Sequence, residues 1–287
     1  MHYIIMDLEW NNSYNKATQK FMNEIIEIGA VKLDESLNEA GTFSELIKPV
    51  VSKKLRSKIK NLTHITNEDV RSGKPFADVI EEFAEWIGDD AVVMSWGDTD
   101  IRTLLSNIKW FLKKNSISFI RKYADLQLYC QNFINMENVQ QAGLSYAAEC
   151  LGIDPDSFRH HRALDDSLLS AECFKKTFNK EKFEAFVKNC NKDFYGRLLF
   201  RPYVIKNKND PLIDKNLFNC FCDICGGEVL PIKKWKFVNQ SFRGVFLCTN
   251  CDREFKVNLR VKKFYDYIDI KRSYSEIIHT KEESETT

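Results

Sequence analysis

Long apolar runs, an excess of charge of one sign and internal repeats are all missing from this sequence. No apolar stretch approaches the roughly 18 residues that a membrane-spanning helix needs. The first residues, which reach acids at Asp7 and Glu9, do not have the pattern of a secretory signal. The 42 Lys and Arg residues balance the 41 Asp and Glu residues, so the net charge of +1 indicates no partner. We therefore expect a cytoplasmic protein with no membrane partner.

Length and the distribution of charge indicate a chain of unlike parts. The 287 residues are 44% hydrophobic, which is enough for one large domain with a small appendage. Residues 181–287 hold 20 basic and 15 acidic residues, against 22 and 26 in the rest of the chain. We expect a large domain over residues 1–180 and a helical connector over residues 181–219. A small β domain should follow over residues 220–270, and residues 271–287 should form a polar, disordered tail.

The hydrophobic pattern of the first part predicts a mixed sheet flanked by helices. Apolar and β-branched runs predict strands over residues 3–6, 24–33, 42–50 and 91–96. Apolar residues spaced three and four apart predict helices over residues 75–87, 100–111, 142–151 and 163–178. Strands that come first and then alternate with helices are typical of an α/β domain.

Acidic residues stand at the ends of several of these elements. Asp7 and Glu9 come at the end of the first strand and point to one face, because strand residues two apart share a face. Asp98 and Asp100 follow the fourth predicted strand, and the last predicted helix begins with His160, His161, Asp165 and Asp166. Each group alone is ordinary at a strand end or a helix start. Together they predict a site for Mg²⁺ or Mn²⁺, which prefer carboxylate oxygens.

The motifs around these acids resemble the DEDDh 3′–5′ exonucleases of the RNase H-like fold. They stand in that family's order: Asp7-x-Glu9, Glu24-Ile-Ile-Glu27-Ile-Gly-Ala, Leu62-Thr-His64-Ile-Thr, Ser95-Trp-Gly-Asp-x-Asp100 and His161-Arg-Ala-Leu-Asp-Asp166. The Trp-Gly pair and the His-Arg-Ala-x-Asp-Asp run are features of its ERI- and KapD-like bacterial members. The resemblance covers about residues 1–180 and implies an RNase H-like mixed sheet flanked by helices.

The resemblance also implies roles for the site residues. Two Mg²⁺ or Mn²⁺ ions would be bound by four carboxylates, Asp7, Glu9, Asp100 and Asp166. His161 would be the general base that accepts the proton of the attacking water. The family's histidine stands five residues before its last aspartate, and an alternative frame with the same spacing pairs His160 with Asp165. Asp98 is the candidate substitute for Asp100 as a metal ligand.

The implied activity is hydrolysis of single-stranded nucleic acid from its 3′ end to nucleoside 5′-monophosphates. RNA is favoured over DNA because of the ERI-like resemblance. The alternative is a non-catalytic nucleic-acid-binding or regulatory module, of the kind linked to sporulation control, that keeps the exonuclease fold. The intact set of acids with its histidine favours the enzyme. Nothing in the sequence indicates the oligomeric state.

Departures from the family pattern concern the substrate. Trp10 and Asn11 stand where many members have small or hydroxyl residues, and Trp10 would either stack on a terminal base or belong to the core. His64 replaces the usual glycine and would alter the wall around the 3′-terminal nucleotide. We expect contacts to substrate from these three residues.

Five of the nine cysteines cluster near the C-terminus, and the odd total fits a disulfide framework poorly. The pairs Cys222-x-x-Cys225 and Cys248-x-x-Cys251 are joined by a stretch that can form a hairpin. Four thiolates predict one structural Zn²⁺ in a small zinc-ribbon β domain. The alternatives are a redox dithiol or four core cysteines, and Cys220 stands one position off the pattern.

Basic residues interleaved with aromatic ones follow the first cysteine pair. Cations neutralise phosphates, and exposed rings stack on unpaired bases. We therefore expect contacts to single-stranded nucleic acid from Lys233, Lys234, Trp235, Lys236 and Arg243. The alternative is that the rings form the core of the ribbon and the lysines form a solvated face.

Overall fold

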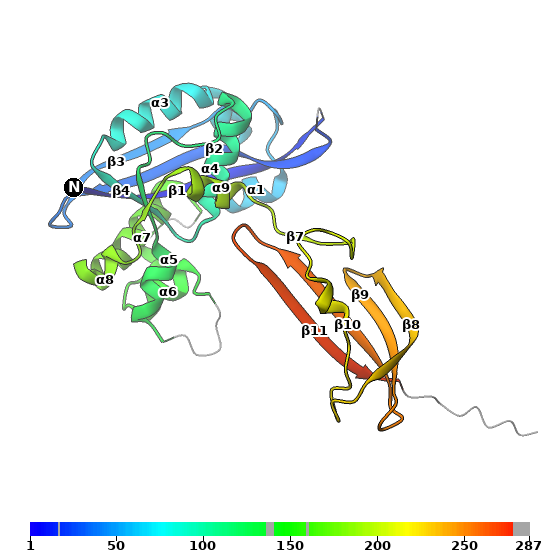
Figure 1. The fold of residues 1–287 in the computed structure, drawn as a ribbon. Coiled ribbons are helices and arrows are strands. Elements are labelled where there is room, and N and C mark those ends of the chain that lie inside the picture. Colours follow the sequence, from blue (N-terminus) through cyan, green and yellow to red (C-terminus); the bar gives the residue numbers. More distant parts are fainter. Residues whose placement is uncertain (17, 136–140, 159–160, 278–287) are drawn as a thin grey trace, which may run out of the picture. The chain divides into compact units, whose positions relative to one another are not determined.

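The computed structural model describes residues 1–16, 18–135, 141–158 and 161–277, and the chain divides into two compact units (Figure 1). The first unit is Met1–Leu199, and the second is Phe200–Thr287. Within the described ranges, no helix has both the length and the apolar character needed to cross a membrane.

A six-stranded mixed sheet forms the centre of the first unit, in the order β3-β2-β1-β4-β5-β6. β1, β2 and β3 are antiparallel, β1, β4 and β5 are parallel, and β6 is antiparallel to β5. The predicted α/β fold is confirmed. The strands are β1 (His2–Asn15), β2 (Lys20–Leu33), β3 (Glu39–Leu46), β4 (Ala91–Ser95), β5 (Lys122–Asp125) and β6 (Lys188–Asn189).

Helices cover both faces of this sheet because β1 is apolar on both sides. Ile4 and Met6 pack into a core with α3 and α4, whereas Tyr3 and Ile5 pack into a core with α7 on the other face (Figure 1). The helices of the first unit are α1 (Ser57–Thr63), α2 (Asn67–Ser72), α3 (Phe76–Ile87), α4 (Thr99–Leu112), α5 (Leu126–Cys130), α6 (Leu144–Cys150), α7 (Ala163–Thr177), α8 (Lys180–Glu184) and α9 (Lys192–Leu199).

Two expectations for the first unit are wrong. The first strand does not end at residue 6, because its polar second half pairs with β2 as far as Asn15 and Lys20; Asp7 and Glu9 therefore lie in the middle of a strand. Residues 181–199 are not a connector, because α8, β6 and α9 pack onto this unit. The hydroxyl of the buried Tyr195 lies within 2.8–2.9 Å of two carbonyl oxygens in the segment before β5.

The second unit is an antiparallel sheet in the order β11-β10-β9-β8, with β7 also beside β10. The predicted limits of the small domain and its tail are wrong, because β7 and η3 (Lys215–Phe218) also pack here and residues 271–276 belong to β11. Residues 278–287 of the predicted tail lie outside the described residues. The strands are β7 (Tyr203–Val204), β8 (Val229–Val238), β9 (Ser241–Cys248), β10 (Glu254–Lys263) and β11 (Ile268–Glu276).

Candidate active site

β1 carries two acidic side chains on the face of the sheet that α7 covers. Side chains alternate along a strand, and Asp7 and Glu9 continue the series of Tyr3 and Ile5, which pack on the α7 side. β1 pairs with β4 only as far as Ile5 and Met94. The edge of β1 is therefore open to other groups beside the two acids.

The first turn of α4 reaches this open edge. Gly97, with φ of +82°, turns the chain between β4 and α4 in a conformation that favours glycine. The buried carboxylate of Asp100 accepts a hydrogen bond of 3.2 Å from the backbone N–H of Leu8. Asp98 instead forms an ion pair of 2.7 Å with Arg102. Of the two acids, Asp100 is the one that contacts β1.

The start of α7 lies directly against β2 and brings a further acid and a histidine. A Cβ atom at Gly29 would be 2.1 Å from the backbone of Ala163, so only glycine permits this approach. Gly29 is the register partner of Asp7. The backbone N–H of His161 donates to the Asp166 carboxylate at 3.1 Å.

The three elements converge on one small volume. One ligand atom from each of Glu9, His161 and Asp166 lies within 4.8 Å of the other two. The carboxylates of Asp100 and Asp166 are close enough to Asp7 to raise its pKa. His160, which the alternative frame pairs with Asp165, lies outside the described residues.

Burial and mutual repulsion raise the pKa values of these acids. Burial raises the pKa of Asp7 well above its usual range, and the surrounding carboxylates raise it further. Burial, then Asp166 and Glu27, raise the pKa of Glu9 to about 8. Burial raises the pKa of Asp100 to about 7, against the opposing effect of its backbone donors. A divalent cation would relieve this repulsion, and oxygen ligands suit Mg²⁺ or Mn²⁺.

Comparison with known proteins identifies the family of the first unit. Residues 4–174 match the exonuclease family RNase_T. The chain belongs to this exonuclease family. It is 34% identical over 177 residues to the probable 3′-5′ exonuclease KapD of Bacillus subtilis (strain 168), a match that covers 60% of this chain and 82% of KapD.

Two further similarities concern proteins named for RNA or for a nucleotide. The exonuclease is 30% identical over 157 residues to 3′-5′ exoribonuclease 1 of Rattus norvegicus, covering 52% of this chain and 45% of that protein. The nuclease domain of 3′hExo, a DEDDh family member solved bound to rAMP, superposes with a TM-score of 0.51 at 24% identity. That match covers 60% of this chain and 88% of the solved one, and it supports the RNase H-like fold.

The role of Glu27 in positioning α7 is missed by sequence reasoning, which identifies this residue only as part of a motif. It is buried on β2 as the register partner of Glu9. Arg162 donates to its carboxylate from Nη2 at 2.6 Å and from Nε at 3.2 Å, and the backbone N–H of Ala163 donates at 3.2 Å. This ion pair fixes the start of α7. Acids inside the apolar run of β2, Glu24 and Glu27, are the sequence signal, because buried carboxylates are rarely unpaired.

Trp10, Asn11 and His64 are the residues expected to contact the substrate, and they lie in three different environments. Asn11 is completely buried, where its amide bonds Ser13 and the backbone of Arg56, so its expected contact with substrate is wrong. Trp10 packs against the core on the α3 and α4 face, as the alternative interpretation held. His64 is exposed at the end of α1 with φ of +57°, which explains why glycine is usual at this position of the motif.

The four cysteines of the second unit form one cluster. The Sγ atom of Cys225 lies 3.4 Å from the Sγ atom of Cys248 and 3.6 Å from that of Cys251. The Sγ atoms of Cys222 and Cys251 lie 3.7 Å apart. Tetrahedral Zn²⁺ with Zn–S bonds of about 2.3 Å needs sulfurs about 3.8 Å apart, so the cluster fits this ion. The backbone N–H of Gly227 lowers the pKa of the Cys225 thiol to about 6, which favours the thiolate.

The aromatic rings closest in sequence to the predicted basic residues pack inside the second unit. Trp235 packs edge-on against Phe218 and donates from Nε1 to the carbonyl of that residue at 3.1 Å. The expectation that Trp235 stacks on bases is therefore wrong, and the rings form the core as in the alternative. Outside this core are exposed Lys233, Lys234 and Lys236 and half-buried Arg243.

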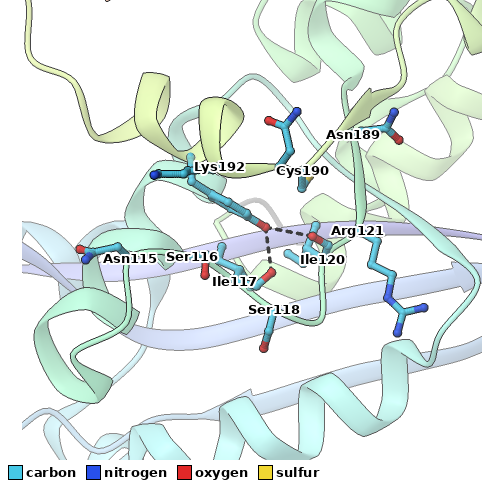
Figure 2. A pocket seen from close by; sticks show the side chains of 11 residues that line it. Asn115, Ser116, Ile117, Ser118, Ile120, Arg121, Asn189, Cys190 and Lys192 are labelled. Atoms are coloured by element: carbon cyan, nitrogen blue, oxygen red, sulfur yellow. Dashed lines mark hydrogen bonds between the residues drawn. The ribbon is translucent and has the colours of Figure 1, made fainter.

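A separate pocket of about 470 Å³ lies between residues 115–121 and residues 189–195 of the first unit (Figure 2). Its charged lining residues are Arg121 and Lys192. Burial raises the pKa of the Cys190 thiol there to about 12, so that this thiol stays protonated and inert. No acid is found among the described residues that line the pocket, so it lacks the carboxylate ligands of the cluster on β1.

The raised pKa values predict an unusual dependence of stability on pH. The folded pKa values of Glu9 and Asp100, about 8 and about 7, exceed the values near 4 of unfolded chains. Between these limits the folded state binds more protons, so without added Mg²⁺ or Mn²⁺ the free energy of unfolding should fall as pH rises from 5 to 7. Asp100→Asn should reduce this slope by about 1.4 kcal/mol per pH unit in urea unfolding.

The matched control is Asp98→Asn, which removes the same charge from the same turn but outside the cluster. It should change the slope much less than Asp100→Asn, because the charge of Asp98 raises the pKa of Asp100 less than burial and Asp166 do. An equal slope in wild type and Asp100→Asn would show that the Asp100 carboxyl is not held protonated by its surroundings.

Proposed function

We propose that this chain is a 3′–5′ exonuclease that degrades single-stranded nucleic acid, RNA in preference to DNA, to nucleoside 5′-monophosphates. The observation that carries the proposal is the convergence of β1, α4 and α7, with Glu9, His161 and Asp166 inside 4.8 Å. The names of the relatives, a probable 3′-5′ exonuclease and an exoribonuclease, support the direction of cleavage and the preference for RNA.

In this proposal each site residue has a defined task. Asp7, Glu9, Asp100 and Asp166 would hold two Mg²⁺ or Mn²⁺ ions. The bound ions would supply a lowered pKa for the attacking water and charge stabilisation for the leaving oxygen. His161, an exposed imidazole at the edge of the cluster, accepts the proton of the water. Its backbone N–H bond to Asp166 fixes its position.

Asp166→Asn tests the catalytic proposal. The amide keeps the acceptor for the N–H of His161 but loses the charge that binds a cation, so cleavage should fall by at least about 10²-fold with no loss of unfolding free energy. The measurement is shortening of a 5′-labelled single strand of RNA or DNA in Mn²⁺.

Asp98→Asn is the control and should cleave normally, because Asp98 is paired with Arg102. Wild-type cleavage by Asp166→Asn together with an inactive Asp165→Asn would move the ligand role to Asp165. Tight binding without shortening by the wild type would instead favour the non-catalytic module.

We also propose that Cys222, Cys225, Cys248 and Cys251 bind one structural Zn²⁺. Cys248→Ser removes a buried thiol of the cluster and should reduce zinc from about one ion per chain to near zero, measured by elemental analysis. Cleavage of a very short substrate should persist, because the carboxylate cluster belongs to the other unit.

Cys220→Ser is the matched control, since Cys220 lies outside the cluster and its thiol faces the carbonyl of Phe221. It should retain the zinc. Purified wild-type protein without zinc would refute the assignment of this site.

A further inference from the structure

We propose that one face of the second unit's sheet, here the cationic face, binds the phosphodiester backbone of the substrate strand by charge rather than by base stacking. The proposal rests on the proposed function for the identity of the polyanion. It differs from the expectation drawn from the sequence, because it excludes Trp235 and the phenylalanines buried beside it and extends the basic surface to β11.

Alternation along β9 and β10 separates two unlike faces. Phe242, Phe246 and Leu259 are buried on one face, which η3 and the residues around Ile205 and Ile213 cover. The intervening residues point to the opposite face. The register of the strands places one set of basic side chains on this cationic face: Lys233, Lys236, Arg243, Lys256, Arg260, Lys262 and Lys271.

Like charges stand directly opposite each other on this face. Lys236 is the register partner of Arg243, and Arg260 is the register partner of Lys271. Cross-strand pairs of like charge destabilise a sheet. Within the described part of the chain, none of these four cations forms an ion pair. An anion held between them would remove the repulsion.

The acids of this face do not neutralise it. Asp269 is the register partner of Lys262 at one end of β10, and Glu254 is the partner of Leu247 at the other end. The central rows contain small neutral side chains instead. Asn258 stands between Arg243 and Ser273, which gives hydrogen-bond donors beside the cations, as phosphate contacts commonly use.

The rings beneath β8, β9 and β10 are buried, and the partly exposed Phe264 and Tyr267 lie only at the end of the face, beside Lys262. Phe246 and Phe255 are buried, and Trp235 packs between Phe218 and Phe246 on the other face, so none of them can receive a base from the cationic face. Contacts to phosphates alone give affinity that depends on salt and not on base identity. We therefore expect uridine and adenosine homopolymers to bind this face equally.

The test compares two full-length variants with equal loss of charge. The face variant carries Lys256→Gln, Arg260→Gln and Lys271→Gln. The control carries Lys206→Gln, Lys208→Gln and Lys215→Gln, which lie in the same unit outside the four long strands. Fluorescence anisotropy measures the Kd for a labelled 20-nucleotide RNA across a salt series without added Mg²⁺ or Mn²⁺.

The face variant should bind at least about tenfold more weakly at 50 mM salt, and its slope of log Kd against log salt should fall by about 2 relative to wild type. The control should change Kd by less than about twofold. Inorganic polyphosphate should compete with RNA for the wild type. Equal Kd values and slopes for the face variant and the control would overturn the proposal, as would a strong preference for one homopolymer.

Two further measurements separate possible failures. Hydrolysis of a dinucleotide in Mn²⁺ should be the same in wild type and face variant; its absence from wild type would refute the proposed catalysis while leaving the binding result intact. Lys271→Glu places an acid opposite Arg260, so it should raise the thermal midpoint of the second unit while weakening RNA binding. A variant that loses both stability and binding would show a structural role instead.

Discussion

Repulsion among buried and half-buried carboxylates is the constraint on which the first unit depends. Asp7, Glu9 and Asp100 come from two elements and share one volume with Asp166 of α7, and their burial raises the pKa values of Glu9 and Asp100 to about 8 and about 7. Groups of this kind separate or stay protonated unless the surrounding structure holds them in place. The packing of the sheet and helices holds the acids together, and a bound divalent cation would neutralise their charge.

The restraint comes from close contacts and buried polar bonds rather than from the acids themselves. Gly29 lets the start of α7 touch β2, and the ion pair between Glu27 and Arg162 fixes the same helix end. Leu8 holds Asp100 through its backbone N–H. The second unit also holds like charges close together, in this case positive ones. On its cationic face basic side chains stand opposite each other, and Trp235, Phe242 and Phe246 pack on the other face.

Much of the site could be predicted from sequence, because the signals are local. The two-residue spacing of Asp7 and Glu9 places both on one face wherever the strand ends, and the CxxC spacing brings sulfurs together at 3.4–3.7 Å. The remainder depends on contacts between distant segments. The length of β1 follows from its pairing with β2, and Asn11 is buried because it bonds the loop around Arg56. The side chain of Trp235 points into the core because β8 contains a bulge before this residue.

Calorimetric titration of the wild type with Mn²⁺ at pH 7, in two buffers of different ionisation enthalpy, tests the central claim most directly. Carboxyls with pKa values of about 7 and about 8 are partly protonated at this pH and must release protons when they bind a cation. The account predicts binding with a heat that differs between the buffers, and a smaller difference for Asp100→Asn. Binding with identical heats in both buffers, or no binding of Mn²⁺, would contradict it.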